Sequence, residues 1–146
     1  MIVISNDHAG MKLKKSFINY FRENNIKFVD CGSNILESKD SFVDFGKSAV
    51  EYYVEKCDTQ KDRLILICGS GIGMSILANR NPAIRAVLAF DKVQAGQGRR
   101  HNDCNCLCLG ERYTSFDKAL EIFNMFMNTK FMGGKYLERM EDIDKD

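Results

Sequence analysis

The chain has few of the residues that mark several classes of protein. Its 146 residues include one proline and no tryptophan, and its formal net charge at pH 7 is +1. A single proline, together with the lack of any low-complexity tract, argues against a linker segment. The near-neutral charge gives no basic surface for nucleic acids or membranes, so we expect neither as a partner. The chain is long enough to bury a core without disulfide or metal support.

The sequence also lacks the features of an exported or membrane-spanning protein. Its first ten residues, MIVISNDHAG, contain no basic segment and only a short apolar run, which is typical of neither a signal peptide nor a membrane span. Six cysteines are present without a CxxC pair, and we expect them to be reduced. We therefore expect a cytoplasmic protein with a single domain, residues 1–146, in which residues 130–146 form a C-terminal extension.

Short apolar segments alternate along the chain with segments of helical periodicity. Strands are expected at residues 2–5, 27–31, 64–67, 86–90 and 106–109. Because strands alternate with helices, we predict a three-layer α/β fold, with helices on both faces of a five-stranded parallel sheet. We expect the strand order 2-1-3-4-5 of a Rossmann/flavodoxin-like fold.

The first helical segment carries three lysines close together. Lys12, Lys14 and Lys15 lie on the side away from the apolar residues of that segment. Side chains on the polar side of an amphipathic helix usually face water. We expect all three lysines to be solvated.

The segment RLILICGSGIGMSILANR, residues 63–80, contains the most informative motif. An apolar strand ends at Cys68 and passes through three glycines, at positions 69, 71 and 73, into a helix. Converging backbone N–H groups and a helix N-terminus bind a phosphate or stabilise an oxyanion. The same positive potential favours the thiolate, the reactive form of cysteine. We predict a functional thiol at Cys68, although a free cysteine is also common as a small core residue.

A dinucleotide-binding fingerprint is an alternative interpretation of this glycine turn. Asp91 follows at a distance that suits such a motif. However, Met74 and Ile76 occupy the positions at which the pattern requires its third glycine, and no Gly-Lys-Ser/Thr sequence follows.

A metal site is compatible with a second cluster, in which Cys104, Cys106 and Cys108 follow His101. Their alternation is typical of one side of a buried strand, and it differs from the ligand spacing of a zinc ribbon or finger. We therefore expect no metal and no cofactor.

Polar residues also follow the first predicted strand. Ligands bind parallel sheets at the carboxyl edge, at the point where the strand order reverses. In the expected order this point lies between the first and third strands. Asp7 and His8 should therefore lie beside Cys68.

Four motifs follow one another along nearly the whole chain. They are NDHAG at residues 6–10, ICGSGIGMSILAN at 67–79, AIRA at 83–86 and RRHNDCNCLCLGER at 99–112. Together they resemble the ribose-5-phosphate isomerase B family, which also includes galactose-6-phosphate and allose-6-phosphate isomerases. The resemblance implies a metal-free aldose–ketose isomerase of the pentose phosphate pathway, which interconverts ribose 5-phosphate and ribulose 5-phosphate. It also implies a homodimer or a dimer of dimers.

The resemblance implies roles for individual residues. Cys68 matches the general base that moves a proton between C2 and C1 through an enediolate, and Ser70 matches a hydroxyl that helps to move the proton between the substrate oxygens. His101 matches the histidine that opens the furanose ring. The remaining residues match groups that contact the substrate. One binds a sugar hydroxyl, one lies beside His101, several offer backbone amides to the enediolate, and the others bind the phosphate through their side chains. These remaining residues are Asp7, His8, Gly69, Gly71, Ile72, Gly73, Met74, Asn102, Arg112, Lys135 and Arg139.

The sequence departs from the family pattern at several positions. Lys135 and Tyr136 replace an arginine and a histidine, and Phe42-Val43 replaces a usual Tyr-Pro. Lysine keeps the positive charge but loses the bidentate geometry that suits phosphate. Met74 stands where some relatives carry a glutamate base, which supports Cys68 as the base here. The alternatives are an isomerase of a six-carbon phosphosugar, such as allose 6-phosphate or galactose 6-phosphate, and a non-catalytic phosphosugar-binding protein.

The order of the predicted elements also bears on how the site is assembled. Cys68 follows a strand, whereas His101 precedes the fifth strand, so the two are expected at opposite edges of the sheet. A strand of about five residues spans about 17 Å. If both residues act on one substrate, His101 must come from a second chain, and the active sites are shared.

Overall fold

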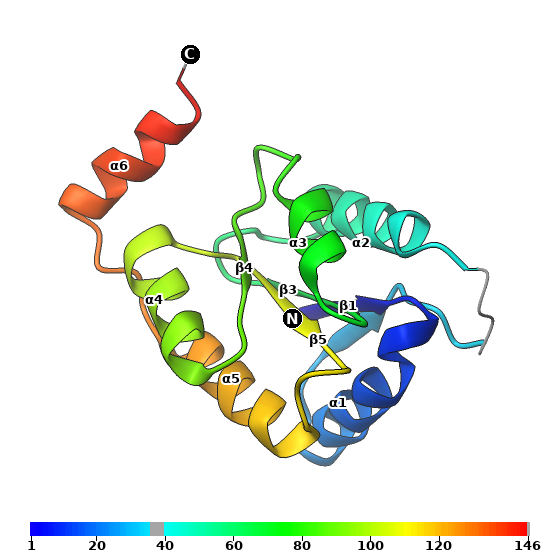
Figure 1. The fold of residues 1–146 in the computed structure, drawn as a ribbon. Helices are drawn as coiled ribbons and strands as arrows, with labels where there is room; N and C mark the ends of the chain where they lie inside the picture. Colours follow the sequence, from blue (N-terminus) through cyan, green and yellow to red (C-terminus); the bar gives the residue numbers. More distant parts are fainter. Residues whose placement is uncertain (36–39, 146) are drawn as a thin grey trace.

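The computed structural model describes residues 1–35 and 40–145 (Figure 1). Its first half contains β1 (Ile2–Asn6), the short helix η1 (His8–Gly10), α1 (Met11–Glu23), β2 (Phe28–Asp30), α2 (Phe42–Lys56) and β3 (Arg63–Cys68). Its second half contains α3 (Ile72–Ala78), β4 (Ala86–Leu88), α4 (Lys92–Asn102), β5 (Cys106–Gly110), α5 (Phe116–Asn128) and α6 (Lys135–Ile143). Part of the loop expected before α2, residues 36–39, lies outside the described residues. None of the described helices combines the length and the apolar character that crossing a membrane requires.

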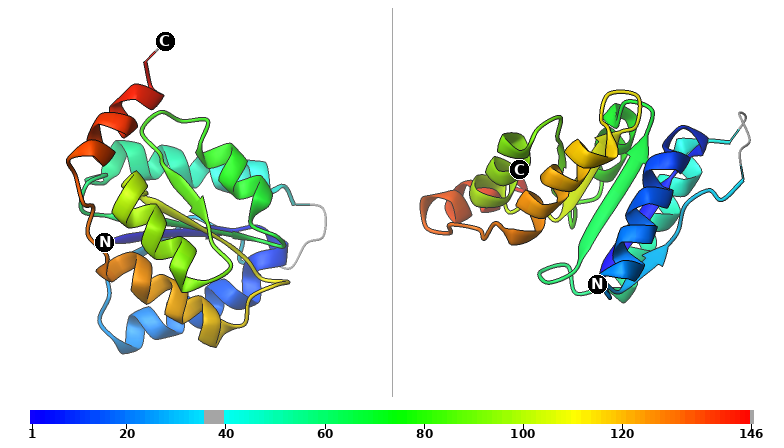
Figure 2. Two further views of the ribbon diagram at one scale, coloured as in Figure 1. Left: turned by 60° about the vertical axis from the view of Figure 1, so that its left-hand side comes forward. Right: turned by 90° about the horizontal axis from the view of Figure 1, so that it is seen from below.

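The predicted α/β architecture with a five-stranded parallel sheet is confirmed. Side chains alternate along each strand, so β3 sends Ile65 and Ile67 to one face, and Leu64, Leu66 and Cys68 to the other. The first face packs against α1, α4 and α5, and the second against α2 and α3. The left view of Figure 2 shows α2 and α3 on one side of the strands and α1 and α5 on the other.

The predicted strand order was wrong at one end of the sheet. The order is β2-β1-β3-β5-β4, so β5 is an inner strand and β4 is an edge strand. All five residues of β5 are buried, whereas the three residues of β4 are only half-buried. The connection from β4 to β5 therefore runs back from the edge of the sheet toward β3. Because such crossovers are right-handed, α4 lies on the same face as α1 and α5.

The corrected order gives β3 two long neighbours. β1 pairs with it from Ile2 to Asn6, and β5 pairs with it from Cys106 to Gly110. The carboxyl ends of all three strands therefore meet, and the loops after β1 and β5 lie on either side of Cys68. At this edge Gly10 touches the β3 backbone closely, since a Cβ on Gly10 would lie 2.7 Å from the carbonyl oxygen of Ile67.

The last helix, α6, extends away from the body of the chain (Figure 1). Its contacts within the described chain are mainly with α4. Met140 is its buried residue, whereas Leu137 and Ile143 are exposed. Most of the surface of α6 is therefore free in a single chain.

Lys14 does not face solvent, as the sequence had led us to expect, although Lys12 and Lys15 do. Its side chain is 3% exposed, and its Nζ forms an ion pair of 3.0 Å with Asp30. The same ammonium donates to the carbonyl oxygen of Ser33 and to the side-chain oxygen of Asn34. Lys14 therefore ties α1 to the segment that follows β2.

We expect Lys14→Met to lower the free energy of unfolding by about 2 kcal/mol, because it leaves the oxygen atoms of three residues without their charged donor. The control is Lys15→Met, a change of the same kind on the exposed side of α1, which should alter stability by less than about 0.5 kcal/mol. The measurement is urea denaturation of both variants at one protein concentration. Equal losses in the two variants would contradict the anchoring role of Lys14.

Candidate active site

The turn after β3 holds the Cys68 thiol against the backbone. Gly71 has a φ of 77°, a left-handed conformation that favours glycine. This conformation lets the chain enter α3 directly after Gly71, and the Gly71 N–H donates a hydrogen bond of 3.1 Å to the Cys68 Sγ. The Ser70 hydroxyl accepts a hydrogen bond of 3.2 Å from the N–H of Ile72 at the start of α3. The sulfur and the hydroxyl thus both bond to backbone N–H groups of the glycine turn.

Two of the glycines leave room for the side chains that flank Cys68. A Cβ on Gly69 would lie 2.9 Å from the Arg112 Cζ, so the guanidinium group packs directly over this glycine. A Cβ on Gly73 would lie 2.8 Å from the ring of Phe42. The N–H of Arg112 also bonds to the carbonyl oxygen of Gly69, which places the β5 loop beside the turn. Arg112 and Phe42 therefore form two walls around the thiol.

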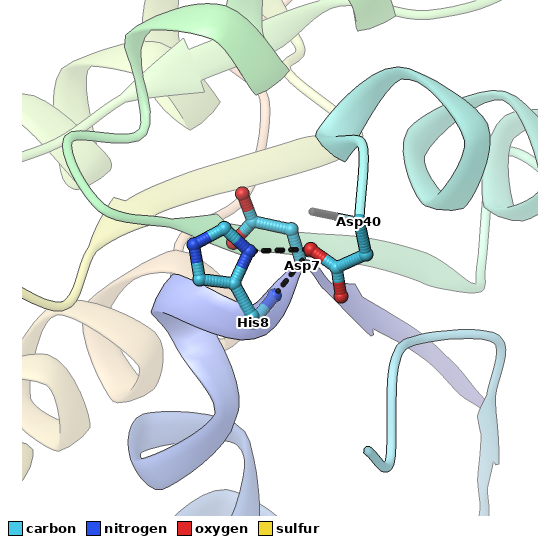
Figure 3. A group of neighbouring side chains, drawn as sticks. All are labelled: Asp7, His8 and Asp40. Carbon is cyan, nitrogen blue, oxygen red and sulfur yellow. Dashed lines mark hydrogen bonds and ion pairs between the residues drawn. The ribbon is translucent and has the colours of Figure 1, made fainter. Parts of the chain in front are cut away.

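Asp7 and His8 form the next part of the site, at the end of β1. The Asp7 carboxylate accepts the N–H of Ala9 at 2.9 Å, and burial raises the pKa of Asp7. Figure 3 shows the His8 ring directed at Asp40, and its Nδ1 lies 2.5 Å from the Asp40 Oδ1. This hydrogen bond raises the pKa of His8. Burial would raise the pKa of Asp40, but the hydrogen bonds from His8 outweigh it and lower that pKa.

These residues surround one small cavity at the carboxyl edge of the sheet, with a volume of about 210 Å³, which we call the Cys68 cavity. It is lined by Asp7, His8, Ala9, Phe42, Cys68, Gly69, Ser70, Gly73 and Arg112. The adjacency of Asp7 and His8 to Cys68, predicted from topology, is therefore observed. Two other predicted residues have side chains elsewhere, since Ile72 is 51% exposed and Met74 is fully buried among the apolar residues of α2 and α3. Neither residue lines the cavity, and the N–H of Ile72 already donates to the Ser70 hydroxyl.

A second group of predicted residues lies at the opposite edge of the sheet. The rings of His101 and Tyr136 stack at a centroid distance of 4.5 Å. The Lys135 Nζ and the Arg139 Cζ lie 5.3 and 5.7 Å from the centre of the Tyr136 ring. The Asn102 amide contacts the sulfur of Met140 at 3.7 Å. This group, which we call the His101 cluster, contains His101, Asn102, Lys135, Tyr136 and Arg139.

A single chain keeps the His101 cluster apart from the Cys68 cavity. Asn102 ends α4 just before β5, at the amino end of the sheet, whereas Cys68 stands at its carboxyl end. Asn102 lines a different cavity, of about 620 Å³, beside β4 and α6. No residue of the His101 cluster lines the Cys68 cavity.

Comparison of the chain with known proteins identifies its family. The model of the ribose/galactose isomerase family matches residues 2–143. The chain belongs to this ribose/galactose isomerase family. It is a sugar-phosphate aldose–ketose isomerase. A Rickettsia conorii protein, named as a sugar phosphate isomerase without a specified sugar, is 38% identical over 142 residues, which are 97% of this chain and 96% of that protein.

Solved structures of this isomerase family have the same fold. Ribose-5-phosphate isomerase B of Clostridium thermocellum is 37% identical, with a TM-score of 0.89, over 97% of this chain and 93% of the other. The Mycoplasma genitalium ribose-5-phosphate isomerase B, solved with bound ribulose-5-phosphate, is 30% identical, with a TM-score of 0.91. That alignment covers 97% of this chain and 92% of the other.

The isomerase has one side chain at this site that the sequence did not reveal. Asp40 lies in the loop of residues 34–41, whose polar residues carry no recognisable motif. Only the folded chain brings Asp40 to His8, 32 residues earlier in the sequence.

The alternative metal site at the three cysteines is not supported by their positions in the isomerase. Cys104 belongs to the core on the α1 face of the sheet, whereas Cys106 and Cys108 belong to the core on the α2 face. Burial raises the pKa of Cys104 to about 12 and the pKa of Cys106 well above its ordinary value, which favours neutral thiols. Among the described residues, Asp7, His8 and Asp40 are the group of potential metal ligands whose donor atoms lie within 4.8 Å of one another.

Proposed function

We propose that the chain interconverts ribose 5-phosphate and ribulose 5-phosphate, with Cys68 as the general base. The observation that carries this proposal is the Cys68 cavity, in which a thiol, a carboxylate and two groups suited to phosphate binding face one small space. A related structure with bound ribulose-5-phosphate supports a five-carbon phosphosugar as the substrate. The family also contains galactose isomerases, so a six-carbon sugar remains the second candidate.

The proton transfer requires a base and a stabiliser of negative charge. In the proposed reaction, the Cys68 thiolate removes the proton from C2 of the open aldose and returns it to C1. The intermediate is an enediolate, whose oxygens carry the developing charge. Backbone N–H groups of the turn residues that line the cavity, Gly69, Ser70 and Gly73, stabilise this charge, and such preorganised donors are usually the largest catalytic term. The Ser70 hydroxyl moves the second proton between the two substrate oxygens.

Binding of the phosphosugar falls to the groups around the thiol. His8 and Arg112 are the phosphate ligands of this chain, since an imidazolium and a guanidinium both donate charge-assisted hydrogen bonds to phosphate. Asp7 accepts a hydrogen bond from a sugar hydroxyl. Phe42 has no hydroxyl group and supplies apolar contact only.

The His101 cluster completes the site from a second chain. His101 opens the furanose ring beside Asn102, and Lys135 and Arg139 add positive charge for the phosphate. The separation of the two groups of residues within one chain supports this arrangement, as does the exposure of α6. A two-fold interface would place each His101 cluster over the Cys68 cavity of the partner and create two equivalent sites. The active form is then a homodimer or a dimer of dimers, in which the extension of residues 130–146 supplies part of each site.

The substrate and the base can be tested in one assay of initial rates with ribose, allose and galactose phosphates. We expect the largest kcat/KM with ribose 5-phosphate. Cys68→Ala should lose at least about a thousandfold in kcat while still binding the sugar, because a general base acts mainly in the transition state. The matched control is Cys57→Ala, a change at a half-buried cysteine outside the cavity, which should keep wild-type kcat.

Three results would contradict the proposal. Preferred turnover of a six-carbon sugar would establish the second candidate. Binding of phosphosugars without turnover of any of them would identify a non-catalytic binding protein. Retention of most of the kcat in Cys68→Ala would remove Cys68 as the base.

Sharing of the site can be tested by mixing two inactive variants. Cys68→Ala and His101→Ala, refolded together in equal amounts, should regain about a quarter of wild-type activity. Random pairing makes half of the dimers mixed, and each mixed dimer has one intact site of two. Subunit exchange should be verified by native mass spectrometry. If mixed dimers form without any recovery of activity, Cys68 and His101 do not act in a shared site.

A further inference from the structure

Asp40 contacts His8 through two hydrogen bonds at once. Its Oδ1 accepts the backbone N–H of His8 at 3.1 Å and also pairs with the ring Nδ1 (Figure 3). Asp40 directly precedes Ser41, whose hydroxyl caps α2 by accepting the N–H of Val43. The carboxylate therefore joins the loop before α2 to the turn after β1.

The pairing fixes which nitrogen of the ring is free. A carboxylate only accepts hydrogen bonds, so Nδ1 must carry the proton in the bond to Asp40. The second nitrogen, Nε2, lies on the side of the ring away from Asp40 (Figure 3). In a neutral ring Nε2 would be an acceptor and would repel a phosphate oxygen. In an imidazolium it is a donor and binds that oxygen.

We propose that Asp40 is a positioning residue, which holds His8 as an imidazolium with Nε2–H directed at the phosphate of the substrate. This inference rests on the proposed function, because it takes the phosphosugar as the ligand of the Cys68 cavity. It assigns a role to Asp40, a residue that lies outside the four sequence motifs on which the family resemblance rests.

The charges around His8 favour the protonated ring. Asp40 faces it from the loop before α2, Asp7 precedes it in the chain, and Arg112 faces it from the loop after β5. The hydrogen bond to Asp40 raises the pKa of His8 most, and the charges of Asp40 and Asp7 add to this, whereas burial and Arg112 lower it. The net shift is upward, so the imidazolium persists to higher pH than in an isolated histidine. Without Asp40 the ring should lose its proton at a lower pH.

The main test compares Asp40→Asn with Asp44→Asn, an identical change four residues later on the exposed surface of α2. We expect Asp40→Asn to raise KM about tenfold at pH 7.5 with kcat within about twofold of wild type, as expected from weakening one charge-assisted hydrogen bond. KM should also begin to rise at a lower pH in Asp40→Asn than in the wild type. Asp40→Glu, which keeps the carboxylate, should restore part of the affinity, and Asp44→Asn should behave as wild type.

A second measurement does not depend on turnover. The chain has two histidines, so the ring signals of His8 can be assigned in NMR spectra by comparison with His101→Gln. The His8 titration midpoint should fall in Asp40→Asn, and addition of inorganic phosphate should raise it in the wild type more than in the variant. This result is readable even if no sugar phosphate is turned over, which separates failure of the inference from failure of the proposed function.

Several outcomes would overturn the positioning role. One is an unchanged His8 titration together with an unchanged KM in Asp40→Asn. Another is a further rise in KM when Asp40→Asn is added to His8→Gln, because Asp40 would then act without His8. A third is activation of the wild type by Mn²⁺ or Zn²⁺ that Asp40→Asn abolishes, since Asp40 would then be a metal ligand. Circular dichroism of each variant must match the wild type, and Asp40→Ser replaces Asp40→Asn if the latter does not fold.

Discussion

β3 is hydrogen-bonded on both sides, to β1 and to β5, and the site depends on this position. Its apolar residues fill the cores on both faces of the sheet, so β3 can present a side chain to a cavity only where the strand ends. That position is Cys68. The loops after β1 and β5 end beside it, and they bring Asp7, His8 and Arg112 to the thiol. The proposed proton transfer therefore depends on the pairing of three parallel strands.

The same architecture separates this group from the His101 cluster. Helices that return across a parallel sheet end at its amino edge, and α4 carries His101 there, where Tyr136 of α6 stacks on it. In this isomerase the proposed proton-transfer groups and the proposed ring-opening group are therefore held by different edges of one sheet. Assembly of two chains is the simple way for both groups to reach one sugar, and the exposed α6 is available for it.

Local sequence patterns predicted much of the fold and part of the site. The unbroken apolar run before Cys68 and the glycines after it specify a strand, a turn and a helix, and the adjacency of Asp7 to Cys68 followed from topology. The order of β4 and β5 was not predictable, because both segments are short apolar runs and their sequences do not rank them as edge and inner strands. Lys14 and Asp40 were missed for a related reason. A lysine on a polar helix side and an aspartate in a polar loop gain their partners only through contacts between distant segments.

The most direct test of the shared site is a crystal structure of Cys68→Ala with ribulose 5-phosphate. In this structure we expect C1 and C2 of the sugar beside residue 68 of one chain and the phosphate on His8 and Arg112. We also expect His101 of a second chain within hydrogen-bonding distance of the same sugar. A sugar bound in the Cys68 cavity with no His101 of any chain near it would contradict the shared site.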